Sequence, residues 1–259
     1  MHIFLVNDDG IGAKGIMALW KAAVERGHEV SMCAPRTQQS AASHRFTLTE
    51  PIYVEPWPVD APGCEAFSIA GSPVDCVRVG LQQLVKKPVD LVLSGINNGY
   101  NAGMAVHYSG TVGAAMEGAL NHLPAIASSI HHKAEPEMLE HLARYTILVA
   151  EQYVKAKTPP CTILNINAPC VPPEKLKAAI YAPLDMGNFI DGYERRESPR
   201  AGTYFWLLSG SRTEEPTPGS DVCCLREGHI TLTLMGNPVT LDKDVWSGTL
   251  AEPFAEKEG

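Results

Sequence analysis

Short β-type segments alternate with amphipathic helical segments through the first 170 residues of this chain. A strand is predicted at 2–6 and a helix at 15–26, where apolar residues recur at helical spacing before Gly27 ends the pattern. Strands joined by helices in this way lie parallel in one sheet, whose faces the helices cover. Further strands are predicted at 29–34, 89–94, 125–129 and 162–166, and further helices at 74–85, 111–121 and 136–155. The alternation therefore predicts an α/β protein with a mostly parallel sheet.

Two parts of the chain depart from this alternation. Residues 46–54 and 64–69 are predicted to form antiparallel strands on either side of a proline-rich joint. From about residue 185 onward the helical pattern ends, and residues 203–208 and 229–234 are predicted to form the two strands of a long hairpin. We therefore expect a main domain at 1–184 and a C-terminal extension at 185–259.

The composition limits the partners of such a chain. Its 259 residues include 29 acidic and 21 basic side chains, and 45% are hydrophobic, which is ample for a core. A net charge of −8 argues against binding to a nucleic-acid duplex. The opening apolar run, 3–6, is too short for a signal peptide or a membrane span. Seven cysteines without a C-x-x-C pair indicate free thiols, so we expect a cytoplasmic protein without a membrane partner.

Two adjacent carboxylates follow the first predicted strand, in the sequence Asn7-Asp8-Asp9-Gly10. Ligands of open α/β sheets bind beyond the carboxyl ends of the strands. Adjacent carboxylates repel each other unless a positive charge lies between them, and both reach one ion only if the backbone turns, which Gly10 permits. The alternative is that one of the two aspartates caps the following helix.

The same turn overlaps the pattern G-x-G-x-x-G at residues 10–15, which is typical of dinucleotide-binding proteins. In those proteins the second strand ends in an acidic residue that binds the ribose, whereas here it leads into Arg36. An arginine at that place is able to accept a 2′-phosphate, so an NADP-type oxidoreductase remains an alternative. No Gly-Lys dipeptide occurs in the chain, which excludes a Walker A loop.

Three further loops carry polar groups at the ends of predicted strands. Residues 37–44 hold three hydroxyls and an imidazole, and residues 95–103 hold three glycines and three asparagines, Asn101 among them. Ser109, Gly110 and Thr111 precede a helix, whose free N–H groups and dipole favour an anion such as phosphate, although Ser109 equally suits a simple N-cap. Asn101 is a further candidate for the phosphate. Because every candidate metal ligand is an oxygen, the sequence favours Mg²⁺ or Mn²⁺ over zinc or copper.

Taken together, these motifs resemble those of the SurE-type survival proteins, a family of metal-dependent 5′-nucleotidases. The matching segments are 6–10, 34–40, 71–76, 94–97, 108–111, 219–221 and 227–233. The resemblance covers nearly the whole chain. It implies a Rossmann-like three-layer αβα fold for a catalytic domain at 1–184, with a C-terminal hairpin arm that exchanges between the subunits of a homodimer or homotetramer.

The resemblance also implies the chemistry. The family hydrolyses nucleoside 5′-monophosphates, and in some members 3′-monophosphates, to nucleoside and phosphate. Carried over by position, Asp8, Asp9, Ser40 and Asn97 would bind one divalent cation per subunit, and Asp8 or Asp9 would accept a proton from water. Ser72, Arg36 and Ala41 stand where the family commonly has Thr, Asp and Gly. A non-catalytic nucleotide sensor is a further alternative.

Overall fold

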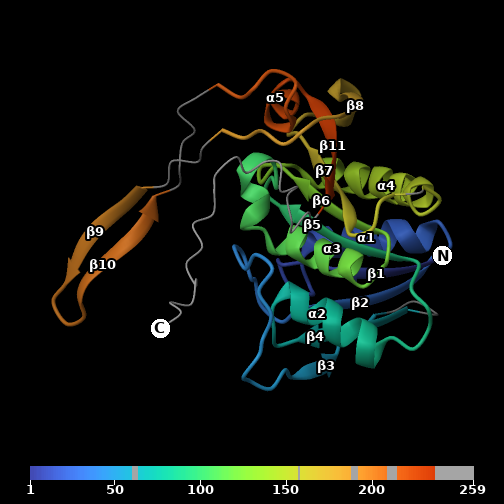
Figure 1. The fold of residues 1–259 in the computed structure, drawn as a ribbon, viewed down its shortest axis with the longest axis horizontal. Coiled ribbons are helices and arrows are strands. Elements are labelled where there is room, and N and C mark those ends of the chain that lie inside the picture. Colours follow the sequence, from blue (N-terminus) through green and yellow to red (C-terminus); the bar gives the residue numbers. More distant parts are fainter. Residues whose placement is uncertain (60–63, 157, 188–191, 209–214, 237–259) are drawn as a thin grey trace, which may run out of the picture.

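A computed structural model of the chain describes residues 1–59, 64–156, 158–187, 192–208 and 215–236. In this part of the chain nine strands form one sheet, in the order β3-β4-β2-β1-β5-β6-β7-β11-β8 (Figure 1). These strands are β1 (His2–Val6), β2 (Glu29–Pro35), β3 (Val54–Pro56), β4 (Cys64–Ile69), β5 (Leu91–Asn98), β6 (Ala125–Ile130), β7 (Thr162–Ala168), β8 (Lys177–Tyr181) and β11 (His229–Gly236). Most neighbouring pairs are parallel, and β3–β4 and β7–β11 are antiparallel, which confirms the predicted mostly parallel sheet.

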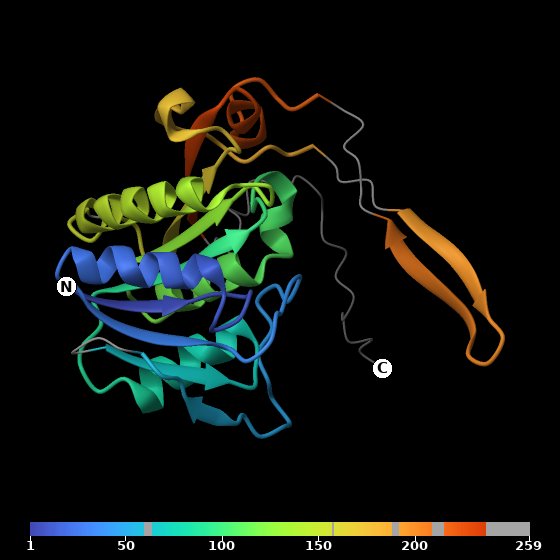
Figure 2. The same ribbon diagram turned by 180° about the vertical axis from the view of Figure 1, so that it is seen from behind.

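Helices cover both faces of this sheet. They are α1 (Lys14–Glu25), α2 (Pro73–Val79), α3 (Gly110–Leu120), α4 (Pro136–Tyr153) and, near the C-terminal end, the short α5 (Asp221–Arg226). Figure 1 shows α2 and α3 in front of the sheet, and Figure 2 shows α1 and α4 on the opposite face. None of the helices within the described ranges is both long and apolar enough to span a membrane.

Successive side chains of β1 enter two separate cores. Ile3 and Leu5 pack in the core beneath α1 and α4, whereas Phe4 and Val6 pack in the core beneath α2 and α3. Side chains along a strand alternate between its faces, so a strand that is apolar at every position must lie between two covered faces. The fully buried run His2–Val6 therefore explains why the chain forms the Rossmann-like αβα arrangement.

The pair of strands predicted at 46–54 and 64–69 is antiparallel, as expected, but its first strand is shorter. Only Val54–Pro56 forms a strand, against β4, and β4 also pairs in parallel with β2. The preceding residues are fixed by side chains instead of a strand ladder, because Thr47 donates from both its N–H and its hydroxyl to Asp75 at the start of α2.

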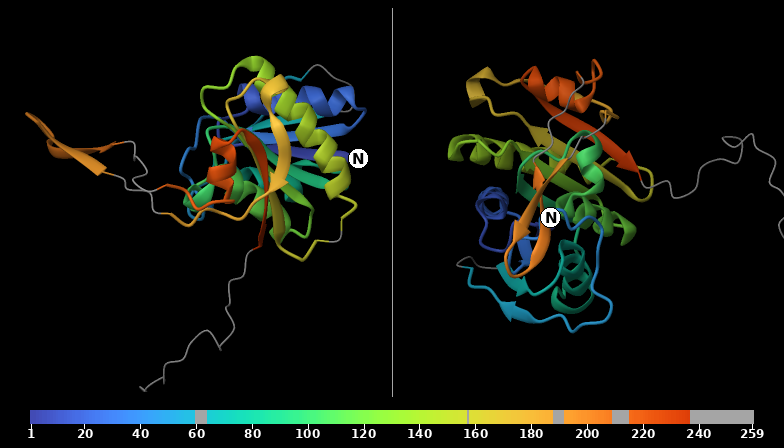
Figure 3. Two further views of the ribbon diagram at one scale, coloured as in Figure 1. Left: turned by 90° about the horizontal axis from the view of Figure 1, so that it is seen from above. Right: turned by 90° about the vertical axis from the view of Figure 1, so that its left-hand side faces the viewer.

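The predicted pairing of residues 203–208 with 229–234 is wrong. Strand β10 (Gly202–Leu208) pairs with β9 (Gly192–Ser198) in a hairpin that lies apart from the main sheet (Figure 3), and β11 lies between β7 and β8. The physical reason is burial. Residues 230–233 of β11 are all buried, as in an inner strand, whereas every residue of β10 is exposed. The chain does form a hairpin in its C-terminal part, but β10 pairs with β9 in it and not with β11. The domain boundary after residue 184 remains a prediction.

Candidate active site

A tight turn after β1 places Asp8 and Asp9 at the carboxyl edge of the sheet. The buried side chain of Asn7 spans this turn, since its Nδ2 donates to the Gly10 carbonyl at 2.8 Å and its Oδ1 accepts from the Gly10 N–H at 3.1 Å. Gly10 has a φ of +107°, a conformation that other residues rarely adopt. The predicted turn at Gly10 is confirmed. Helix α1 begins after Ala13 without a side-chain cap, so neither aspartate caps it.

Asp8 lies against the N-terminus of α3. The Thr111 hydroxyl and N–H both donate to its carboxylate, at 2.5 and 3.2 Å. The approach depends on Gly110, because a Cβ there would lie 3.1 Å from Asp8 Oδ2. Burial raises the pKa of Asp8 to about 6; the Thr111 hydroxyl opposes this rise, and the negative charge of Asp9 adds to it.

Asp9 contacts the end of β5 and the loop after β2, and these are the two strands beside β1. The N–H of Asn98, at the end of β5, donates to Asp9 Oδ2 at 3.0 Å, and Gln38 Nε2, in the loop after β2, lies 3.5 Å from Oδ1. Gln38 Nε2 also donates to Ser40 Oγ at 3.0 Å. Burial raises the pKa of Asp9, although the Asn98 N–H works against it. Sequence reasoning missed Gln38, whose only signal was its place in a polar loop two residues before the candidate ligand Ser40.

The four predicted metal ligands therefore come from segments that direct contacts join: Asp8, Asp9 and Ser40 lie in loops, and Asn97 lies near the end of β5. The loop carrying Ser40 is tied to β1 by the Gln39 N–H, which donates to the Asp8 carbonyl at 2.7 Å. The amide nitrogen of Asn97 donates to the Gly99 carbonyl at 2.9 Å, which leaves the amide oxygen as the atom suited to a cation.

The predicted phosphate ligands divide into two groups. Ser109 accepts a hydrogen bond from the Val112 N–H, so it does act as the N-cap of α3, and with Gly110 and Thr111 it lies next to Asp8. Asn101 is instead buried among the strands. Its Nδ2 donates to Ser129 Oγ at 2.8 Å, and its backbone is held by the side chains of Asn165 and Asn167 from β7.

The donor set suits a hard cation. Two carboxylates, one hydroxyl and one amide are all oxygen donors, and burial raises the pKa of both aspartates. Across the described ranges no group of three or more His, Cys, Asp or Glu side chains comes together that could hold a metal ion.

The glycine pattern at 10–15 has a packing role in this structure. A Cβ on Gly15 would lie 1.9 Å from the Ile96 carbonyl oxygen, so the glycine allows α1 to lie directly against the end of β5. Arg36, the candidate for a 2′-phosphate, forms an ion pair with Glu55 at 2.7 Å. The third glycine of a dinucleotide-binding motif has the same packing role, so only the Arg36–Glu55 pair weighs against the dinucleotide alternative.

The fold and the site define an α/β protein with oxygen donors gathered beyond the carboxyl ends of parallel strands, where ligands of open α/β sheets bind. The chain belongs to the survival protein SurE family, whose family model matches residues 3–189. It is 39% identical over 233 residues to the 5′-nucleotidase SurE of Nitratidesulfovibrio vulgaris, covering 90% of this chain and 92% of that protein. The 5′-nucleotidase SurE of Heliobacterium modesticaldum is 34% identical over 264 residues, covering 99% and 96%. Among solved structures, the SurE protein from Aquifex aeolicus matches with a TM-score of 0.76 and 28% identity, covering 95% of this chain and 96% of that one.

Proposed function

We propose that this chain is a 5′-nucleotidase that hydrolyses nucleoside 5′-monophosphates to nucleoside and phosphate, with 3′-monophosphates as a second substrate class. This proposal rests on the Asp8–Asp9 pair, whose carboxylates contact the N-terminus of α3 and the end of β5 at one edge of the sheet. Curated relatives named 5′-nucleotidase SurE, which match over 90% of the chain or more, support the same activity.

The proposed metal site consists of Asp8, Asp9, Ser40 and Asn97, with one Mg²⁺ or Mn²⁺ per subunit. When bound there, such a cation polarises a phosphoryl oxygen and lowers the pKa of a water molecule. Contacts through Gln38, Asn98 and the Gln39 N–H support this grouping, since they connect the loops that carry the four residues.

The N-terminus of α3 is the proposed phosphate site. Ser109, Gly110 and Thr111 would hold the negative charge that spreads over the phosphoryl oxygens, because the helix dipole and N–H groups favour an anion there. Thr111 would have to share donors that bind Asp8 in this structure. Asn101, the fourth predicted member, would have to give up its bond to Ser129 to touch the phosphate. Asp8 or Asp9 is the proposed group that accepts a proton from water, since both carboxylates lie at this edge of the sheet.

Phosphate release from a panel of nucleoside 5′- and 3′-monophosphates tests this function, with Mn²⁺, Mg²⁺ or EDTA present. We expect release only with a divalent cation. Full activity after exhaustive chelation, with the absence of metal checked by elemental analysis, would contradict the metal site. Tight nucleotide binding without release would favour the sensor, and quenching of tryptophan fluorescence by NADP without metal would favour the oxidoreductase.

Substitution of the ligands tests their assignment. Asp8→Asn and Asn97→Ala should each lower kcat/KM by about 10²-fold or more, because each removes a group that holds the cation. Asp90→Asn is a suitable control, since Asp90 binds the His2 N–H at the start of β1, at the other end of the strand. Near wild-type turnover in both ligand variants would show that the cation is held elsewhere.

The assembly and location follow from other parts of the chain. We propose a homodimer or homotetramer in which the β9–β10 hairpin contacts a second subunit, because this hairpin exposes apolar side chains on Tyr193, Tyr204, Phe205, Trp206, Leu207 and Leu208. The proposed location is the cytoplasm, which the seven unpaired cysteines support.

A further inference from the structure

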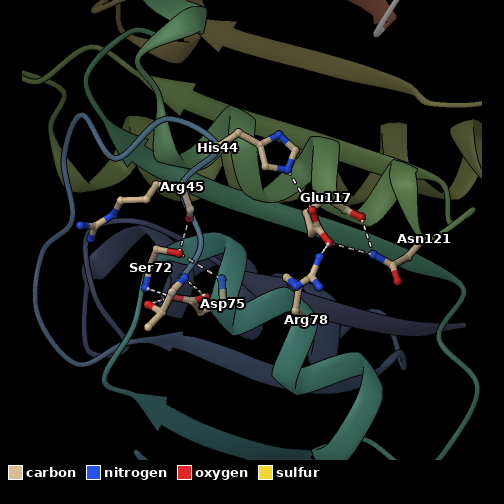
Figure 4. A network of polar contacts seen from close by, with 8 residues as sticks. His44, Arg45, Ser72, Asp75, Arg78, Glu117 and Asn121 are labelled. Carbon is tan, nitrogen blue, oxygen red and sulfur yellow. Dashed lines mark hydrogen bonds and ion pairs between the residues drawn. The ribbon is translucent and has the colours of Figure 1, made fainter. Parts of the chain in front are cut away.

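One buried carboxylate outside the proposed metal site joins three elements that surround it. Glu117 of α3 is only 5% exposed. His44 Nε2 donates to its Oε2 at 2.9 Å, and Arg78 of α2 donates to its Oε1 at 3.2 Å (Figure 4). The Asn121 side chain donates to the carbonyl and the carboxylate of Glu117. These partners, His44 first, hold the pKa of Glu117 below its usual value. The carboxylate is therefore ionised and fully engaged.

His44 belongs to a segment, residues 43–47, that is fastened at both ends. At one end, the Ser43 hydroxyl and N–H donate to the carbonyls of His107 and Tyr108, at 2.7 and 3.0 Å. The contact with α3 is close, because a Cβ on Gly113 would lie 2.4 Å from the Ser43 carbonyl oxygen. This end of the segment thus lies against the start of the helix that carries the proposed phosphate site.

The other end of the segment is bound to α2. Ser72, the N-cap of α2, donates its hydroxyl to the Arg45 carbonyl at 2.6 Å, and Asp75 accepts both hydrogen bonds from Thr47 (Figure 4). The guanidinium of Arg78 also lies 5.1 Å from the centre of the Phe46 ring. Arg78 therefore contacts both the segment and Glu117.

These contacts connect two ligands of the proposed metal site. Ser40 lies three residues before Ser43, so the fastened segment fixes one end of the loop that carries Ser40. Helix α3 carries Glu117 on its later turns, and at its first turn Thr111 holds the Asp8 carboxylate. Glu117 is thus the point at which the Ser40 loop and the helix that orients Asp8 are joined by charged hydrogen bonds.

We propose that Glu117 is a positioning residue, which holds Ser40 at the distance from Asp8 that cation binding requires. The inference rests on the proposed function, since it concerns the same site. Groups that orient metal ligands commonly change metal affinity by about 10-fold or more when they are replaced. A carboxylate that served only to stabilise the fold would change the free energy of unfolding without changing the affinity of the folded protein for Mn²⁺.

The test compares two similar carboxylates at different places. Glu151 of α4 binds Arg26 and His28, as Glu117 binds Arg78 and His44, but it connects α4 to the C-terminal end of α1. The Mn²⁺ Kd of the full chain is measured by electron paramagnetic resonance of free Mn²⁺, for wild type, Glu117→Gln and Glu151→Gln. We expect a Kd about 10-fold higher in E117Q and unchanged within twofold in E151Q. Urea unfolding in EDTA checks that each variant is folded.

Two further variants keep the test decisive if E117Q does not fold. His44→Ala removes one donor to Glu117 and should also raise the Mn²⁺ Kd, whereas His44→Gln keeps a donor and should restore part of the affinity. In kinetics, E117Q should need more Mn²⁺ for half-maximal rate, with kcat at saturating Mn²⁺ close to wild type.

Unchanged Mn²⁺ affinity in E117Q, or in H44A where E117Q is unfolded, overturns the proposal. So does an equal loss in E151Q. Failure of the proposed function looks different: the wild type would bind Mn²⁺ and release no phosphate from any nucleotide, while E117Q would still bind Mn²⁺ more weakly. A wild type that binds no Mn²⁺ overturns both.

Discussion

Asp8 combines burial with a second carboxylate one residue away, and this combination should make the stability of the metal-free protein depend on pH. The pKa of Asp8 rises from 3.8 to about 6 on folding. Between these values the folded protein keeps a proton that the unfolded chain releases, so the free energy of unfolding falls as pH rises. The fall is on the order of 2–3 kcal/mol and ends near pH 6.

Urea unfolding in EDTA at several pH values measures this effect, with Asp8→Asn as the reference. The difference in the free energy of unfolding, D8N minus wild type, should increase from pH 4 to pH 6.5 and then level off. Subtracting D8N removes the contributions of other acids, such as Glu117 and Glu151, whose pKa values are lowered. A difference that stays constant across this range would mean that Asp8 ionises normally.

Replacing Asp9 should raise the stability of the metal-free protein and weaken its binding of metal. Without metal, neutralising it removes the burial of one charge and its repulsion of Asp8, about 1 kcal/mol after screening. We expect Asp9→Asn to melt at a higher temperature than wild type in EDTA. The variant should also gain less from Mn²⁺, because a ligand stabilises the native state in proportion to its affinity for that state. Thermal melts in EDTA and in Mn²⁺ compare the two proteins.

A higher melting temperature of D9N in EDTA, with a smaller gain from Mn²⁺, would show that Asp9 lowers stability in exchange for metal binding. If D9N is less stable than wild type in EDTA, or if Mn²⁺ raises both melting temperatures equally, the two carboxylates have a structural role.

At the scale of the elements, strand and helix positions were predictable where one periodicity dominates. Strand β1 has a continuous apolar run at 3–6, and α1 and α4 show a clear apolar stripe, so their positions followed from the sequence. Pairing was harder to predict, because β10 and β11 have similar β-type compositions. Only the long-range packing of β11 between β7 and β8 distinguishes them.

Short elements and bridging side chains were also missed. Helix α5 spans six residues, too few for a period to show, although Ser220 caps it as a serine before a helix should. The carboxyl ends of β1 and β5 were predictable as a site because parallel strands end at one edge of a sheet. The N-terminus of α3 was predictable because Ser109 and Thr111 stand at the start of a helical pattern. The contacts of Asn101 with side chains of β7 were not predictable. They depend on how deeply the loop of Asn101 is buried, which the spacing of residues in the sequence does not show.

The contact between α1 and β5 allows a test at this scale. Gly15→Ala would place a Cβ 1.9 Å from the Ile96 carbonyl oxygen, so the helix must move away from the strand end. We expect a loss of about 1–3 kcal/mol in the free energy of unfolding, despite the better helix propensity of alanine. Mn²⁺ affinity should fall as well, because Ile96 precedes Asn97.

Gly12→Ala is the matched control from the same turn. A Cβ on Gly12 would meet the Trp57 ring at 3.5 Å, an ordinary contact, so the change should stay within about 0.5 kcal/mol. Urea unfolding of both variants compares them. Equal stabilities would show that α1 is free to shift without cost.

At the scale of the whole molecule, the hairpin and the main sheet separate assembly from folding. Residues 192–208 pair only with each other among the described strands, whereas β11 is part of the main sheet. Replacing residues 192–208 with a short Gly-Ser linker should therefore leave the sheet folded and convert the oligomer to a monomer. Light scattering measures the mass, and urea unfolding checks the fold. A full-length monomer at micromolar concentration, or an unchanged oligomer after the replacement, would exclude the hairpin as the interface.

The place of β11 in the sheet also has a consequence for synthesis on the ribosome. Strand β8 pairs with β11 alone in the described sheet, and β11 lies between β7 and β8 although it follows both in the chain. A nascent chain that has not yet reached residue 229 therefore has an open edge on β7 and an unpaired β8. Open strand edges invite pairing with other chains. Until residues 229–236 are translated, the edge of β7 therefore stays open to pairing with other chains.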